Sequence, residues 1–174
     1  MKLLRWIRFT WELPKLPTPG TAAESQYRFR NATREEQETV RHVIISAFTL
    51  DSGFSDTLKS IRDWIEAQID EVFRHKDVPC VVITHGTRII GASALDLEPN
   101  AECHLLTGPC ILNEYRNRGL GSALLHHSLL ALREAGLEKA RAVTKENVPA
   151  AKFVYRKFNS QSEPAEFEPA MAGS

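Results

Sequence analysis

A loop rich in arginine and glycine, residues 112–122, constrains this chain more than any other feature, because it joins a predicted strand to a predicted helix. The backbone N–H groups in the first turn of a helix have no partner within the helix and carry partial positive charge. Gly119 and Gly121 allow a ligand to approach the backbone closely, and Arg116 and Arg118 add formal charge. The sequence therefore predicts a site for a phosphate or a similar anion at this turn.

Two common phosphate-binding motifs do not fit this loop. The P-loop places a lysine directly after its last glycine, and no lysine follows the glycines here. The dinucleotide fingerprint requires a glycine where the chain has Leu124, and an acidic residue about 20 positions further on, where it has Ala140 and Arg141. The predicted anion site is therefore of another kind.

The apolar periodicity of residues 26–160 predicts the element order β-α-α-β-β-β-α-β-α. Thr33 and Glu36 form a capping box at the start of the first helix. The predicted elements are a strand at 26–30, helices at 34–47 and 58–72, strands at 80–84 and 88–97 joined by a turn at His85-Gly86, a strand at 102–112 bent at Gly108-Pro109, a helix at 119–135, a strand at 140–144 and a helix from near residue 147. This order indicates an α/β (α+β) fold, a mixed sheet with helices on both faces.

Residues 1–25 are predicted to be an extension and linker that precede the domain. Residues 1–13 are rich in leucine, tryptophan and phenylalanine, and their charged side chains share one arc of a helical wheel. Residues 13–20 contain three prolines and a glycine, which is typical of a linker. Three interpretations stay open: a segment packed on the domain or on a partner, a helix on a membrane surface, or a mis-assigned start codon. The domain is predicted at 26–160, followed by a polar tail at 161–174.

The charge and the cysteines exclude several classes of protein. The chain has 22 Lys+Arg and 22 Asp+Glu, and this neutral total argues against a nucleic-acid-binding protein. Cys80, Cys103 and Cys110 are odd in number and lack metal-ligand spacing, so we expect reduced thiols, no metal site and a cytoplasmic protein. No apolar run approaches the ~18 residues that span a bilayer, so stable membrane insertion is not expected. Residues 114–157 nevertheless carry nine basic and four acidic residues, which suits a polyanionic ligand.

The spacing R-x-x-G-x-G, formed by Arg116, Gly119 and Gly121, resembles the hallmark of the GNAT superfamily of N-acetyltransferases at this strand-to-helix turn. The chain has Asn113 and Asn117 where the usual form of the motif has proline and glycine. Neither departure removes a backbone donor, so the resemblance supports the anion site.

Residues 147–158 resemble a second landmark of the family, a helix that an asparagine opens and on which a tyrosine about two turns on faces the thioester. Asn147 and Tyr155 correspond to these two residues. Tyr155 lies one residue later than the commonest spacing, at which Val154 falls instead. The resemblance covers roughly residues 26 to 159.

The resemblance implies a GNAT-like, mostly antiparallel central sheet and acetyl-CoA as co-substrate. The pyrophosphate would lie on the amides of residues 116–122, and the pantetheine arm would pair like an extra strand with the strand before them. The implied cofactor-binding residues are Cys110, Ile111, Leu112, Arg116, Asn117, Arg118, Gly119, Leu120, Gly121, Ser122 and Asn147.

The resemblance also implies that an acceptor amine attacks the thioester carbonyl directly. Tyr155 is the candidate acid that donates to the departing thiolate. Glu102 and His104 lie where the family often has a general base, and we favour Glu102. The acceptor would be a small-molecule or peptide amine, contacted by residues 50–57 and 96–101. The alternative is a non-catalytic acyl-CoA-binding or regulatory module with the same fold.

The C-terminal end departs from the family, which usually closes with two more strands after the last helix. Only about 16 residues follow that helix here, so we expect these strands to be shortened or missing. Residues 162–170, the N-terminal arm or a partner chain would then complete the sheet. An exposed sheet edge together with an apolar N-terminus would favour a homodimer.

Overall fold

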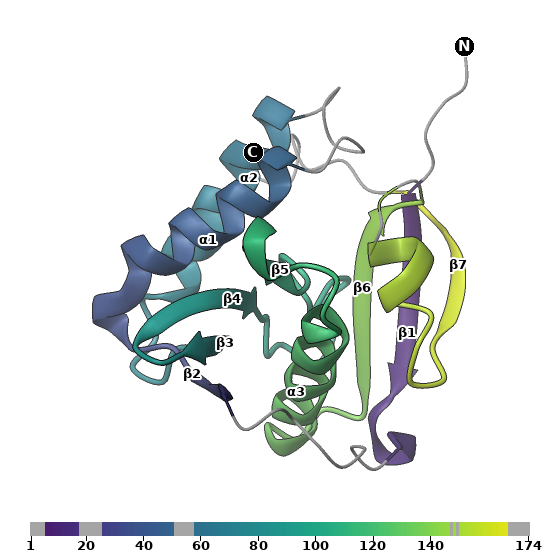
Figure 1. Ribbon diagram of the computed structural model, residues 1–174. Helices are drawn as coiled ribbons and strands as arrows, with labels where there is room; N and C mark the ends of the chain where they lie inside the picture. Colours follow the sequence, from purple (N-terminus) through teal and green to yellow (C-terminus); the bar gives the residue numbers. More distant parts are fainter. Residues whose placement is uncertain (1–5, 18–25, 51–57, 147, 149, 167–174) are drawn as a thin grey trace.

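The computed structural model describes residues 6–17, 26–50, 58–146, 148 and 150–166 (Figure 1). Its strands form two antiparallel sheets, a four-stranded sheet in the order β2-β3-β4-β5 and a three-stranded sheet in the order β6-β1-β7. Helices α1 and α2 lie on one side of the four-stranded sheet and α3 on the other (Figure 1). The predicted α/β fold, mostly antiparallel with helices on both faces, is therefore confirmed. The bounds are β1 Trp6–Glu12, β2 Tyr27–Asn31, α1 Gln37–Leu50, α2 Leu58–Val72, β3 Cys80–His85, β4 Arg88–Ala94, β5 Cys110–Ile111, α3 Leu120–Glu134, β6 Lys139–Lys145 and β7 Gln161–Ala165.

The hairpin of β3 and β4 carries the predicted turn and a bulge. Gly86 has φ +62° in the turn, a backbone conformation that suits glycine. The register shifts between Ile83 and Thr84, so that Ile90 becomes the extra residue of a bulge beside Gly91. A Cβ at Gly91 would lie 2.8 Å from the Cδ1 atom of Ile111. Gly91 therefore allows β5 to approach β4 closely.

The strand predicted at 102–112 is mostly not a strand. Only Cys110–Ile111 pairs with β4, and Gly108 has φ +66° at the expected bend. Upstream of the bend, the N–H groups of His104 and Leu105 both donate to the Arg141 carbonyl in β6. This segment therefore ties the two sheets together at one end, and β5 and β6 are left to diverge at the other.

Strand β1 lies at the centre of the second sheet, between β6 and β7 (Figure 1). Phe9, Trp11 and Leu13 alternate along the chain and are at most 1% exposed, which is the two-residue period of a strand with one buried face. Residues 6–12 therefore pack in the same fold as residues 26–160, from which the sequence analysis separated them. Of the three interpretations of this segment, the structure supports the one in which it packs on the domain.

The tail predicted at 161–174 also contributes to the sheet, because Gln161–Ala165 forms β7.

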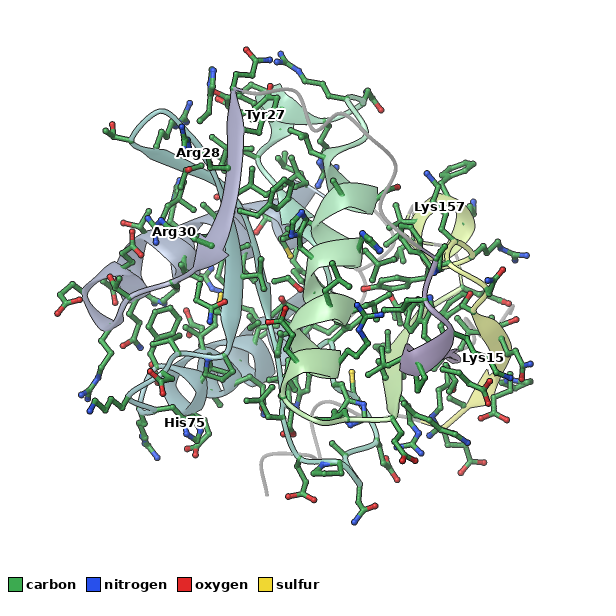
Figure 2. The ribbon with its side chains drawn as sticks, turned by 90° about the horizontal axis from the view of Figure 1, so that it is seen from below. Lys15, Tyr27, Arg28, Arg30, His75 and Lys157 are labelled. Atoms are coloured by element: carbon green, nitrogen blue, oxygen red, sulfur yellow. The ribbon has the colours of Figure 1, made fainter. Side chains whose placement is uncertain are left out.

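The argument for a homodimer rested on an exposed sheet edge and an apolar N-terminus, and the structure buries Phe9 and Trp11 within the same chain. Of the edge strands, β7 contains Pro164, and β2 carries the exposed Arg28 and Arg30 (Figure 2). Proline and charge both oppose pairing at these two edges, and the apolar N-terminal strand is no longer an argument for a homodimer.

The capping box before α1 makes a prediction about stability. The Glu36 carboxylate accepts a hydrogen bond from the Thr33 N–H (2.8 Å) and a bidentate pair from Arg30 (2.7 and 2.8 Å). The Arg30 hydrogen bonds lower the pKa of Glu36 to about 2. Because this pKa lies below that of a free carboxyl, the stabilisation is present above about pH 4.5 and is lost as the pH falls towards 2.

We expect Glu36→Gln to lower the free energy of unfolding at pH 7 by about 1 kcal/mol, as for the loss of a helix cap. Urea unfolding at pH 7 and at pH 3 measures this effect. The difference between variant and wild type should shrink at the lower pH, and an equal difference at both values would contradict the role of the carboxylate.

Candidate active site

A cavity with a volume of about 350 Å³ lies beside the predicted loop, where β5 and β6 diverge. The loop before α3 and the start of that helix form one wall, and β6 with the π turn η5 (Ala150–Val154) forms the other. Nine of the predicted site residues line it: Cys110, Ile111, Arg116, Asn117, Gly119, Leu120, Gly121, Ser122 and Tyr155. Leu112, Arg118 and Glu102 are not among its lining residues, and Asn147 lies outside the described residues.

The loop is shaped by two residues with left-handed backbone conformation. Asn117 has φ +65° and Gly119, the N-cap of α3, has φ +76°. Asparagine is among the few side chains that tolerate this conformation, so Asn117 can replace the glycine of the usual motif. The first bond of the helix runs from the Ala123 N–H to the Gly119 carbonyl (3.2 Å). The N–H groups that precede Ala123 therefore have no acceptor within the helix and are available to an anion in the cavity.

The guanidinium groups of both loop arginines contact other parts of the protein, and Arg116 also lines the cavity. The Arg116 guanidinium donates to the carbonyl of Ala47 in the last turn of α1 (3.2 Å) and to that of Ile111 (3.5 Å). Arg118 donates to the Tyr27 hydroxyl (3.1 Å) and lies over the Tyr115 ring at 5.2 Å. Arg116 thus ties the loop to α1, and Arg118 ties it to β2.

Lys157 supplies a cation that the sequence analysis missed. Its Nζ atom lies 2.8 Å from the Ser122 hydroxyl oxygen in the first turn of α3, and the residue lines the cavity (Figure 2). The sequence held no signal for this placement, because Lys157 follows the π turn and its direction depends on how that turn closes.

The π turn explains the unusual spacing of Tyr155. The Tyr155 N–H donates to the Ala150 carbonyl (2.8 Å), a bond that spans five residues instead of the four of an α-helix. The turn thus absorbs the additional residue. Tyr155 is 4% exposed and lines the cavity, and a Cβ at Gly108 would collide with its hydroxyl oxygen. Gly108 therefore makes room for this hydroxyl.

Burial raises the pKa of Tyr155 well above its usual value, and the nearby Cys103 and Cys110 thiols act in the same direction. The hydroxyl is therefore protonated at neutral pH and is available as a hydrogen-bond donor.

The predicted general base does not reach the cavity. Glu102 is exposed on the segment before the bend. His104 is fully buried, with Nε2 2.9 Å from the Glu98 carbonyl oxygen and Nδ1 accepting from the Arg141 N–H (3.0 Å). The bend expected at Gly108-Pro109 is present, but the segment before it does not continue β5 and instead bonds to β6 through the N–H groups of His104 and Leu105. His104 therefore joins the sheets and is not positioned as a base.

A second, narrower cavity meets the first at Tyr155. The two share Phe48, Thr107, Thr144 and Tyr155. The second is otherwise lined by apolar side chains, among them Trp6 from β1 and Trp64 from α2. The Tyr155 side chain thus lies between a cavity beside the anion loop and an apolar cavity that faces α2.

The sequence of residues 26–159 matches the family model described as Acetyltransferase (GNAT) family. The chain belongs to the GNAT family of acetyltransferases. Solved structures with a similar fold include a GCN5-related N-acetyltransferase from Sphaerobacter thermophilus, at 15% identity with a TM-score of 0.66, covering 94% of this chain and 50% of that one. Another is a GCN5-related N-acetyltransferase from Kribbella flavida, at 16% identity with a TM-score of 0.57, covering 92% and 55%. This chain therefore spans about half the length of these structures.

A search of curated proteins finds no match to this chain. Within the part of the chain that the structure describes, no helix is long and apolar enough to cross a membrane. The same residues contain no group of three or more His, Cys, Asp or Glu that could hold a metal ion.

The different contacts of Lys157 and Arg118 lead to a prediction for cofactor binding. We expect Lys157→Met to raise the dissociation constant of acetyl-CoA about tenfold, because a charge-assisted hydrogen bond to a phosphate is lost. Arg118→Met should change that dissociation constant less than about threefold, since Arg118 lies outside the cavity. The same substitution should lower the free energy of unfolding by about 1 kcal/mol, because Arg118 loses its contacts with Tyr27 and Tyr115. Calorimetric titration and thermal unfolding of both variants measure the difference; the reverse order of affinities would refute it.

Proposed function

We propose that this chain transfers an acetyl group from acetyl-CoA to a primary amine. The observation that carries the proposal is the position of Tyr155, which lines both cavities and shares the first of them with the start of α3. The amides would bind the pyrophosphate, with Lys157 as the nearby cation. The pantetheine arm would run along the edge of β5 that faces away from β4, which brings the thioester towards Tyr155.

The reaction would proceed by direct attack. The amine nitrogen forms a bond to the thioester carbonyl carbon, and the carbon–sulfur bond breaks as the tetrahedral intermediate collapses. Tyr155 donates its proton to the departing sulfur, and the tyrosinate recovers a proton from the former amine through water. The products are an N-acetyl amide and free CoA, so atoms and charge balance.

The acceptor would enter through the cavity that faces α2. Among the described residues, the lining of the two cavities includes no carboxylate and no histidine. We therefore infer that the acceptor reacts as the neutral amine and that water carries its proton away.

A cytoplasmic location is part of the proposal, because Cys80, Cys103 and Cys110 are all buried and free.

A non-catalytic acyl-CoA-binding module is the second candidate, and the same lack of a described base in the cavities favours it. One experiment separates the two. Acetyl-CoA binding to the purified chain is measured by calorimetry, and a panel of primary amines is then screened for release of free CoA thiol. Thiol release that depends on an amine supports the transferase, whereas binding without release from any amine supports the module. Absence of acetyl-CoA binding would exclude both.

A further inference from the structure

Two aromatic residues of the N-terminal strand enclose the side chain that the mechanism uses. The Phe9 ring centroid lies 5.5 Å from that of Tyr155 at an interplanar angle of 52°, and Trp11 meets Tyr155 edge-on at 5.9 Å and 77°. These are favourable distances and angles for aromatic pairs. Phe9 and Trp11 are themselves 6.3 Å apart. The three rings thus form one cluster, which we call the β1 aromatic cluster.

Trp11 also holds the chain that follows the π turn. Its indole Nε1–H donates to the Lys157 carbonyl (2.9 Å), and the Ser160 hydroxyl donates to the Tyr155 carbonyl. A π turn is short and uncommon, so its geometry depends on contacts outside itself. These two hydrogen bonds fix the backbone on the C-terminal side of Tyr155, while the Ala150 carbonyl fixes it on the other.

The strand that carries these rings is a rigid support. Trp6–Glu12 pairs along its whole length with β6 and over Trp6–Thr10 with β7, so most of β1 is held on both sides. Phe9 and Trp11 are at most 1% exposed, and their rotamers are fixed by packing. On the far side of the Tyr155 ring, the hydroxyl meets the backbone at Gly108. The hydroxyl is therefore confined between β1 and the bend before β5.

We propose that Phe9 and Trp11 are positioning residues of the active site, which hold the Tyr155 hydroxyl at the thioester. The proposal rests on the proposed function, because it assigns these residues an effect on the step in which Tyr155 donates its proton. An acid that is displaced by a fraction of an ångström loses much of its contribution to the rate. Phe9 and Trp11 would therefore contribute to catalysis without lining either cavity.

The test uses Trp11→Phe, which keeps an aromatic ring and removes the indole N–H, and Phe9→Leu, which keeps an apolar side chain and removes the ring. We expect each to lower kcat about tenfold and to leave the KM for acetyl-CoA within about twofold. Each variant is then combined with Tyr155→Phe. In that background the two substitutions should have no further effect on kcat, because they act through the hydroxyl that is already gone.

Leu13→Val provides the matched control. Leu13 is as buried as Trp11 and follows it on the same side of the chain, so its truncation reduces stability without altering the aromatic cluster. It should leave kcat unchanged below the unfolding temperature. If Trp11→Phe and Phe9→Leu lower kcat equally with and without the Tyr155 hydroxyl, the two residues have only a structural role and the proposal is overturned. The same conclusion follows if Leu13→Val lowers kcat as much as they do.

A second measurement does not require turnover. Tyr27, Tyr115 and Tyr155 are the three tyrosines, and 3-fluorotyrosine labelling gives one fluorine resonance for each, with Tyr155→Phe identifying the resonance of Tyr155. Trp11→Phe should shift or broaden that resonance and leave the other two in place. An unchanged Tyr155 resonance overturns the proposal. If the resonance shifts as expected but the wild type does not bind acetyl-CoA, only the proposed function is refuted.

Discussion

Gly119→Glu is expected to weaken acetyl-CoA binding by at least about 100-fold. Gly119 is the N-cap of α3 and has φ +76°, and a Cβ at this position would meet no atom within 4 Å. The new side chain therefore projects into open space at the helix start, where its carboxylate interacts with the same free amides that would bind the pyrophosphate. Competition for these donors and repulsion between like charges both oppose the cofactor.

Gly86→Glu is the control for this substitution. Gly86 also has positive φ (+62°) and open space around its Cβ position, and it lies in the turn between β3 and β4. The two variants therefore have a similar backbone strain and the same change in charge. Calorimetric titration with acetyl-CoA should show wild-type affinity for Gly86→Glu and none for Gly119→Glu. Equal affinities, with both proteins folded by thermal unfolding, would locate the cofactor elsewhere.

Tyr155→Phe is expected to lower kcat about 100-fold, the size of effect typical for loss of a general acid. Because burial and the Cys103 and Cys110 thiols raise the pKa of Tyr155 above its usual value of 10, the hydroxyl remains protonated through neutral and mildly alkaline pH. The wild-type kcat should therefore show no decline caused by Tyr155 below about pH 10. The KM for acetyl-CoA should stay within about twofold, since phenylalanine preserves the ring contacts with Phe9 and Trp11.

Steady-state kinetics on any amine that releases thiol, measured from pH 6 to pH 10, tests this expectation. Val154→Ala is the comparison, because Val154 lies at the position of the commonest tyrosine spacing and also lines the cavity. If Val154→Ala reduced kcat more than Tyr155→Phe did, the π turn would not have moved the tyrosine into the catalytic position. A rate that is insensitive to Tyr155→Phe would require another proton donor.

The anion loop could be predicted from the sequence because its determinants are local. Glycines, arginines and a helix start lie within one short segment, and Asn117 could be accepted in place of glycine because it tolerates positive φ. The directions of the arginine side chains could not be predicted, since the partners of Arg116 and Arg118 are Ala47 and Tyr27, which lie far away in the chain. The local sequence therefore predicted where the anion loop lies, but not what its arginine side chains contact.

Two further differences from the sequence analysis also have a non-local cause. Strand β1 was assigned to an extension because its partners, β6 and β7, follow most of the domain in the sequence. Its alternation of Phe9 and Trp11 with polar residues was visible, but the helical wheel gave an equally regular pattern. The choice of Glu102 as the base followed from its place on the strand predicted at 102–112, and only Cys110–Ile111 of that segment forms a strand.

The central place of β1 has a consequence for the order in which this protein assembles during synthesis. Trp6–Glu12 leaves the ribosome well before its partners β6 and β7. The four-stranded sheet and the anion loop precede β6 and β7 in the sequence, so they can form while Phe9 and Trp11 still lack these strands. Closing so long a loop is slow, and the aromatic segment is open to wrong pairing until β7 arrives. The enclosure of Tyr155 is therefore the last part of the candidate site to form.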